Sequence, residues 1–285
     1  AEAGAFSATA SAFSDAVRQT TREVLASIEA VCNVQFLEVA DTAASHGTLR
    51  YAFSQQPNSM GYAGYAFYPS PSPIGGDIWI GKAQAGAEWD YYRPGLILHE
   101  TLHALGLKHP FEGGQTLSID EDIIPTTVMS YSPVEGSRSG ALSRYPCEPM
   151  PLDIQALQAL YGKVPSNSGD TAYDLSTPDF QDNFHVVLDS GGVDTLDATR
   201  LTCAVSINLT PGAASAVGLV VDAFAYSGSG ASRTYTHSVY ASTLQIAQDT
   251  WIENAVGTAG DDRLAGNALA NMLVGGAGND VLSGG

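Results

Sequence analysis

Half of the six histidines in this chain lie within one twelve-residue stretch, HETLHALGLKHP, which begins at His99. His99 and His103 are four residues apart, so on a helix they present both imidazoles on one face, with Glu100 beside them. Gly106 can adopt the positive φ that ends a helix and turns the chain, which would bring His109 back as a third nitrogen. Three protein ligands leave a zinc ion room for water, and Glu100 is placed to take the proton of that water. The stretch therefore predicts a zinc centre of the catalytic kind.

The length of this pattern decides how much weight it carries. Single histidines usually belong to the surface or to a satisfied core, and a bare HExxH is only moderate evidence for a metal site. The extended pattern HExxHxxGxxH fixes five positions, and its chance occurrence in this composition has a probability on the order of one in ten thousand or less. We therefore interpret the three histidines as metal ligands.

The segments around this stretch are expected to form the scaffold that positions it. Apolar residues at helical spacing predict one long amphipathic helix over residues 6–34, with Ser7 or Ser11 as its cap. Strand alternation follows at NVQFLEVA, GTLRYAFS, GYAGYAFYP and GDIWIGK. The helix of the histidines is expected to begin near Pro94, because proline suits the first turn of a helix. After a loop-rich stretch, PLDIQALQALYG predicts a short helix that closes at Gly162.

Composition and charge limit the classes of partner. A hydrophobic fraction of 44% predicts a folded protein, and 285 residues are enough for one or two domains. The formal charge of -18 argues against nucleic acid and anionic membranes and favours bound cations. No apolar run approaches the roughly 18 residues of a membrane helix, so we expect a soluble chain without a membrane partner. The chain does not begin with methionine, which suggests processing or trimming, and its three distant cysteines allow at most one internal disulfide.

The character of the chain changes near Val164. Beyond it, short apolar runs separated by Gly, Asp, Ser and Thr replace helical periodicity, so we place one domain at 1–164 and a second at 165–285.

The tail carries three units of nine residues, GTAGDDRLA, GNALANMLV and GGAGNDVLS, and stops as a fourth would begin, which predicts a short or truncated array. The glycines permit tight turns whose carbonyls face a cation, and this density of oxygen ligands suits calcium.

The stretch HETLHALGLKHP followed by TVMSYSP resembles the serralysin branch of the metzincin metallopeptidases, in which a methionine-containing turn carries a tyrosine two residues on. The resemblance implies that Met129 lies beneath the zinc ligands. It also implies that Tyr131 is a weak additional zinc ligand, which swings away and stabilises the oxyanion as substrate reacts. AGYAFYP resembles the edge strand that binds substrate as an added antiparallel strand, through backbone groups around Gly64 and Ala66. An ordinary sheet strand is the alternative here, because periodicity does not distinguish an edge.

The same resemblance implies a fold and a set of calcium ligands. The expected fold class is α+β: a metzincin catalytic domain with a mixed twisted sheet and long helices, followed by an all-β parallel β-roll or sandwich domain.

One calcium ion would be held by Asn167, Gly169, Thr171, Asp189, Gly191 and Asp194. The next would be held by Gly192, Asp194, Trp251 and Glu253. In the repeats, an ion would lie between Thr258, Gly260 and Asp262 on one turn and Gly276, Gly278 and Asp280 on another. A further turn, with Asn267, Leu269 and Asn271, would share its ion with a turn that is mostly absent. A solvated acidic loop is the alternative for the first two sites.

These features together predict a secreted zinc-dependent endopeptidase that cleaves peptide bonds with a zinc-activated water and is stabilised by structural calcium. Its expected partners are protein or peptide substrates, with a protein inhibitor also conceivable, and we expect a monomer that acts outside the cell after bacterial-type export. The alternative is a calcium-dependent adhesion or binding module with an inert metallopeptidase domain. Against it stands the complete set of site residues, because an inert descendant has no chemical reason to keep Glu100. Three features depart from the family pattern: the cysteines, the few residues before the first helix, and the lack of a visible carboxy-terminal secretion signal.

Overall fold

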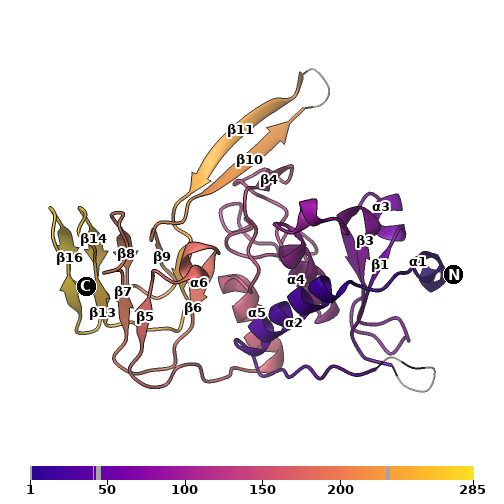
Figure 1. Cartoon of the computed structure of the whole chain (residues 1–285), viewed down its shortest axis with the longest axis horizontal. Helices are drawn as coiled ribbons and strands as arrows, with labels where there is room; N and C mark the ends of the chain where they lie inside the picture. Colours follow the sequence, from indigo (N-terminus) through magenta and orange to yellow (C-terminus); the bar gives the residue numbers. More distant parts are fainter. Residues whose placement is uncertain (1, 41, 43–45, 229–231) are drawn as a thin grey trace.

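The structure, a computed structural model, describes residues 2–40, 42, 46–228 and 232–285. Figure 1 shows an elongated molecule in which most helices lie toward the N-terminal end and a β-rich part lies toward the C-terminal end. A hairpin of two long strands projects from the middle of the molecule. Many strands and few helices agree with the expected α+β class at this level of description. Among the described residues, no helix is both long and apolar enough to cross a membrane.

The first part of the chain combines a small sheet with the helix of the histidines. Its elements are α1 (Glu2–Ser7), α2 (Asp15–Glu29), β1 (Arg50–Ser54), α3 (Gln56–Ser59), β2 (Gly64–Ala66), β3 (Asp77–Gly81), two 3-10 helices (Lys82–Gln84 and Ala87–Trp89), α4 (Arg93–Ala104), β4 (Gly140–Leu142) and α5 (Pro151–Tyr161). Strand β3 is central, parallel to β1 and antiparallel to β2, which leaves β2 at an edge of the sheet. Helix α4 packs on β2 and β3, and Ile78 and Ile80 of β3 are buried in one cluster with Leu98 and Leu102 of α4. The sheet therefore supports the histidine helix along its length.

The expected long helix over residues 6–34 is two helices, because other contacts interrupt it. Ser11 forms a β-bridge with Phe53, in which each backbone N–H donates to the other residue's carbonyl at 2.9 Å. Helix α2 then begins after Ser14, whose hydroxyl accepts from the Val17 N–H at 3.4 Å, so neither Ser7 nor Ser11 caps it. The expected strand NVQFLEVA, residues 33–40, is not a strand in the structure. Strands within the other three segments are confirmed as β1, β2 and β3.

The second part of the chain is almost entirely β-structure. Its elements are β5 (Ala172–Asp174), α6 (Pro178–Gln181), β6 (His185–Val187), β7 (Thr195–Asp197), β8 (Ser206–Asn208), β9 (Ala214–Ser215), β10 (Val221–Ser227), β11 (Thr234–Tyr240), β12 (Leu244–Ile246), β13 (Asn254–Val256), β14 (Arg263–Ala265), β15 (Met272–Val274) and β16 (Val281–Ser283). Two sheets, ordered β15-β13-β7-β5 and β16-β14-β8, contain only parallel pairs. Strands β10 and β11 form the projecting antiparallel hairpin.

The nine-residue units appear as strands that alternate between these two parallel sheets. Strands β13, β14, β15 and β16 begin at Asn254, Arg263, Met272 and Val281, nine residues apart. Strand β13 pairs with β15, and β14 pairs with β16. The apolar eighth residue of the first unit, Leu264, is buried. A repeat of nine residues that changes sheet at each step is therefore present in the structure.

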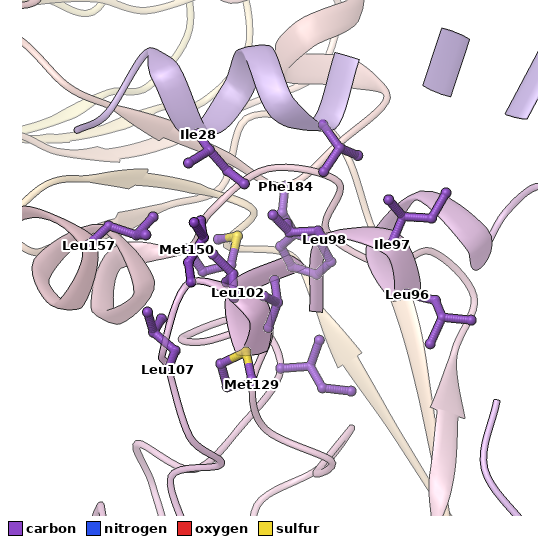
Figure 2. Packing of buried hydrophobic residues seen from close by; sticks show 14 of the residues in the cluster. Ile28, Leu96, Ile97, Leu98, Leu102, Leu107, Met129, Met150, Leu157 and Phe184 are labelled. Carbon is purple, nitrogen blue, oxygen red and sulfur yellow. The ribbon is translucent and has the colours of Figure 1, made fainter. Parts of the chain in front are cut away.

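Two buried clusters hold the molecule together, and the larger one crosses the predicted boundary near Val164. It joins Ile28 of α2, Leu98 of α4 and Leu157 of α5 with Phe184, which lies beyond that boundary. Figure 2 shows Phe184 among these side chains. Strand β4 also pairs with β10 of the second part. The boundary itself stays a prediction, but burial and strand pairing tie the two parts together across it.

Candidate metal centre

Helix α4 places the first two histidines on a rigid support. It begins with Arg93 and Pro94, and the buried Arg93 side chain donates to the Gln84 carbonyl at 2.9 Å, which anchors this end. The helix ends at Ala104, and Gly106 has φ +103°, a conformation that side-chain-bearing residues rarely adopt. The expected helix start and the expected turn at Gly106 are confirmed.

After this turn the chain returns His109 to the other two imidazoles. His109 Nε2 lies 3.2 Å from His99 Nε2 and 3.0 Å from His103 Nε2. These three residues form a group whose ligand atoms all lie within 4.8 Å of one another. The geometry brings the three expected zinc ligands to one point, where they could hold a metal ion.

Hydrogen bonds to the outer nitrogens show which atoms of this group carry lone pairs. His99 Nδ1 lies 2.7 Å from the Val128 carbonyl and His103 Nδ1 lies 2.8 Å from the Leu107 carbonyl. A carbonyl only accepts, so both Nδ1 atoms carry the proton and both Nε2 atoms present lone pairs to the centre. The single N–H that His109 could point toward the centre can donate to only one of these two Nε2 atoms. Converging imidazole lone pairs fit a zinc ion, for which such outer hydrogen bonds orient the ligands.

Burial keeps the histidines neutral. It lowers the pKa of His99 to about 3, an effect that the nearby His103 reinforces. Burial likewise lowers the pKa of His103 to about 4. Neutral imidazole is the form that binds a metal, so the site needs no loss of protons from these two groups near neutral pH.

Glu100 projects from the same helix into the space in front of strand β2. Its side chain is buried, and burial raises the pKa of Glu100 to about 8. Its carboxylate packs against the Cα of Gly64: a Cβ built on Gly64 would lie 2.5 Å from Glu100 Oε1. Glycine at this position is therefore what permits the carboxylate to lie where it does.

Met129 and Tyr131 are two residues apart in one loop, where Met129 is buried in the hydrophobic core and Tyr131 contacts the histidine rings. Met129 is buried in the same cluster as Leu102 of the histidine helix and Leu107 of the turn that follows it (Figure 2). The Tyr131 ring is stacked on His99 at 5.7 Å and meets the His109 ring edge-on at 4.6 Å. Burial, reinforced by the Glu100 charge, raises the pKa of Tyr131 to about 12, so its hydroxyl keeps its proton.

Two adjoining hollows flank Glu100 and Tyr131. The first, of about 290 Å³, extends from Gly64 and His99 to Arg138 and Gly140. The second, of about 370 Å³, is lined by Gly64, Ala66, His103 and His109 along the edge strand β2. The two residues expected to bind substrate thus lie on an edge strand that borders a hollow beside the histidines.

Asp194 lies at the centre of the first group of expected calcium ligands. Its Oδ1 accepts from the Thr171 N–H at 2.8 Å, and its own N–H donates to Glu253 Oε2 at 2.8 Å. Its Oδ2 is buried with no hydrogen-bond partner among the described residues, and burial raises the pKa of Asp194. Trp251, two residues before Glu253, has a 42% exposed side chain.

The remaining residues of this group lie on the two loops that meet at Asp194. The Gly191 N–H donates to Asp189 Oδ1 at 2.8 Å, and a Cβ on Gly192 would lie 2.6 Å from the Gly169 carbonyl oxygen. Asn167 has φ 47°, a left-handed conformation that asparagine tolerates better than most residues. The chain brings these loops together, and their role as calcium ligands stays a prediction.

In the repeats, the structure pairs the two expected ligand turns position by position: Thr258 with Gly276, Gly260 with Gly278, and Asp262 with Asp280. A Cβ on Gly276 or Gly278 would overlap the facing carbonyl. The Asp262 N–H donates to Asp280 Oδ1 at 3.0 Å. The Thr258 and Gly260 carbonyls thus face the glycines of the second turn, and the Asp280 carboxylate faces the Asp262 backbone.

The middle turn of the repeats has hydrogen bonds like those of the first turn, where Thr258 bonds to Asp262, but makes them with neutral side chains. Asn271 Nδ2 donates to Asn267 Oδ1 at 3.0 Å, and the Leu269 N–H donates to the same oxygen at 3.0 Å. Asn271 Oδ1 accepts from the Asn267 N–H at 2.8 Å. Asn271 stands where the neighbouring turns have Asp262 and Asp280, so a calcium ion finds less charge at this turn.

Sequence reasoning missed Asp153, which supports the metal site from α5. Its Oδ2 accepts from the Val128 N–H at 2.9 Å and from the Met150 N–H at 3.0 Å, and its Oδ1 accepts from the Thr127 hydroxyl at 2.6 Å. Val128 is the residue whose carbonyl holds His99. The sequence does show that Asp153 is an acidic residue in the first turn of a helix that begins at Pro151. Its spacing does not reveal that its partner is the distant Val128.

Comparison with known proteins gives a consistent result. No family model matches the chain. Serralysin B of Dickeya chrysanthemi is 30% identical over 70% of this chain and 42% of its own length. Metalloprotease AprA of Pseudomonas entomophila is 30% identical over 93% of this chain and 56% of its own. A serralysin of Photorhabdus laumondii is 28% identical over 92% of this chain and 55% of its own length. The chain thus spans about half the length of the curated relatives it matches.

The fold and the site define a mixed α/β protein in which three histidines are placed to hold one metal ion. The similarity to these relatives over most of the chain shows a serralysin-type metzincin.

Proposed function

We propose that this chain is a secreted zinc-dependent endopeptidase of the serralysin type that hydrolyses peptide bonds and is stabilised by calcium. The observation that carries the proposal is the convergence of His99, His103 and His109 at Nε2 distances of 3.0 and 3.2 Å, with the Glu100 carboxylate beside them. We include in the proposal action outside the cell, a monomeric state, and protein or peptide substrates. Relatives named serralysin and metalloprotease support the proposed activity.

Strand β2 is proposed to bind the substrate main chain. It pairs with β3 on one side and is at the edge of its sheet, so its other side has backbone groups free to pair with an extended peptide. Gly64 and Ala66 would supply these groups. A peptide bound there would run past Glu100 and Tyr131, which line both hollows.

The proposed chemistry divides between the ion and the protein. Zinc held by the three histidines supplies Lewis acidity, which makes a water molecule nucleophilic and polarises the scissile carbonyl. Glu100 accepts the proton of the attacking water and returns it to the departing amine. The protonated Tyr131 hydroxyl donates a hydrogen bond to the oxygen that becomes negatively charged.

The second part of the chain is proposed to be a parallel β-roll that binds structural calcium. The three-residue strands that recur every nine residues and alternate between two parallel sheets support this architecture. The buried, unpartnered Asp194 Oδ2 beside Glu253 supports a cation there, because a buried carboxylate oxygen is costly without one.

A quenched-fluorescent peptide library tests the activity. With zinc loaded, the protein should cleave members of the library, and Glu100→Gln should bind one zinc per chain while losing activity by about 10³-fold, as expected for a general base. Full activity in Glu100→Gln would refute the role of Glu100. Zinc binding without any cleavage by the unaltered protein would instead favour the inert binding module, which no present finding supports.

A further inference from the structure

Phe111 lies outside the zinc motif, yet its ring contacts the third histidine. The Phe111 and His109 rings are parallel to within 4°, with centroids 5.0 Å apart. The Phe111 ring is also 5.2 Å from the ring of Tyr131. A single aromatic side chain therefore contacts both the third expected ligand and the expected oxyanion donor.

Arg138 lies over the same phenylalanine and is itself anchored. Its guanidinium carbon is 4.0 Å from the Phe111 ring centroid, within the range of cation–π attraction. Arg138 Nη2 donates to Asp122 Oδ2 at 3.0 Å, and Asp122 Oδ1 accepts from the Ser130 hydroxyl at 2.6 Å. Asp122 and Ser130 are both buried, so the carboxylate that holds Arg138 is fixed in place, although the Arg138 side chain itself is half exposed.

His109 needs such support more than the other two histidines. His99 and His103 are each oriented by a backbone carbonyl, at 2.7 and 2.8 Å. His109 Nδ1 lies 2.9 Å from Glu112 Oε1 but in a geometry that makes no hydrogen bond, and the Glu112 side chain is 50% exposed. An exposed carboxylate holds a partner weakly, because water competes for it and its side chain is mobile. The orientation of the His109 ring therefore depends on ring packing.

We propose that Phe111 and Arg138 act as a brace that positions the His109 imidazole and so sets how tightly the site retains its metal. Both are positioning residues, and neither is expected to touch the ion. The inference rests on the proposed zinc site. Outer groups that orient metal ligands commonly contribute tenfold or more to metal affinity.

Metal affinity and ligand geometry test the brace without reference to catalysis. The purified chain and its variants are loaded with Zn²⁺ in competition with a chelator, and separately with Co²⁺, whose visible absorption reports ligand geometry. Phe111→Leu should weaken zinc binding about tenfold and alter the cobalt spectrum, whereas Phe111→Tyr, which keeps the ring, should stay within about twofold of the unaltered protein. Arg138→Gln should act in the same direction as Phe111→Leu, and the two changes together should be less than additive.

The chain offers a matched control outside the site. Phe224 of β10 stacks on His237, which is not an expected metal ligand, with centroids 4.9 Å apart, so Phe224→Leu removes the same kind of ring contact from a histidine outside the metal centre. It should leave zinc affinity and the cobalt spectrum unchanged. Circular dichroism of the metal-free variants checks that each one folds.

Three outcomes would overturn the brace. Zinc affinity and a cobalt spectrum unchanged in Phe111→Leu would do so while leaving the zinc site intact. Equal losses in Phe111→Leu and Phe111→Tyr would show that the ring is not what positions His109. Failure of the unaltered protein to bind either metal would remove the proposed function together with the brace.

Discussion

Gly64 of the edge strand and Glu100 of the histidine helix are in direct contact, with no room for a side chain between them. A Cβ built on Gly64 would lie 2.5 Å from Glu100 Oε1 and 2.8 Å from its Cγ. Gly64→Ala should therefore push the carboxylate out of place. Because small misplacements of a reacting group are costly, we expect peptide cleavage to fall about 10²-fold with zinc content unchanged.

Gly114→Ala is the matched control for this substitution, because a Cβ there would meet no atom within 4 Å. It should leave cleavage as it is. Unaltered cleavage by Gly64→Ala would show that the Glu100 carboxylate moves without loss, and that the close contact is not needed.

The hydroxyl of Tyr131 can be tested separately from its ring. Tyr131→Phe keeps the ring contacts with His99 and His109 but removes the proton donor. We expect kcat to fall about 10²-fold with little change in KM, as when one donor to an oxyanion is lost. Steady-state kinetics at fixed zinc content measure this, with Tyr235→Phe, which is exposed on the hairpin, as control. A fall in zinc content, or a rise in KM alone, would contradict a role confined to the transition state.

Calcium should raise the thermal stability of the second part of the chain. An ion that binds only the folded form at a hundred times its dissociation constant adds about 2.7 kcal/mol, which shifts the unfolding midpoint by several degrees. Asp194→Asn should remove much of this shift because Asp194 Oδ2 is buried and unpartnered. Calorimetry with and without chelator gives the measurement.

Two controls separate specific binding from simple screening of the -18 net charge. Magnesium at the same concentration should not reproduce the shift, because it keeps its water and prefers fewer protein ligands. Asp249→Asn changes an exposed carboxylate that pairs with Lys163, and it should respond to calcium as the unaltered protein does. Equal shifts with both ions would argue against calcium sites.

His185 and Glu148 join the two parts of the chain and should make its stability depend on pH. Their Nδ1 and Oε1 atoms are 2.8 Å apart. Burial opposes the charge of His185, but the Glu148 carboxylate more than offsets this, so the pKa of His185 is raised above its usual 6.5. A raised folded-state pKa means that the contribution is complete below pH 6.5 and is lost as the pH rises through the folded value.

Urea unfolding of the unaltered protein and of Glu148→Gln measures this contribution. The substitution should cost about 1 kcal/mol at pH 5.5 and less at pH 8.5, because glutamine still accepts a hydrogen bond but carries no charge. His185→Gln should cost a similar amount, and the double variant should not cost the sum. A cost that is independent of pH would show that the pair is not charged in the folded protein.

Local spacing was enough to predict the parts of the site that one element supplies. His99 and His103 share a helix face because they are one turn apart, and Gly106 takes the positive φ that glycine adopts at little cost. The nine-residue repeat predicted strands that return at the same interval. Each of these depends on neighbours in the chain, which the sequence displays directly.

Contacts between distant residues could not be read in the same way. Ser11 pairs with Phe53 and interrupts the expected long helix, although the apolar residues around Ser11 keep helical spacing. Phe184 is buried in the core of the first part although it lies twenty residues beyond the expected boundary at Val164. No local period encodes such partners, because tertiary packing overrides local propensity where it buries more apolar surface or pairs more backbone groups.

The sequence by itself determined which residues can bind a metal and their order along the chain, because ligand chemistry and helical periodicity are properties of residue type and spacing. Only the tertiary structure decided how those atoms are held. The links from Asp153 through Val128 to His99, and from Arg138 through Phe111 to His109, join residues on separate elements. Such links exist only once the elements have packed, since a hydrogen bond or ring contact depends on distances in space that sequence separation does not set.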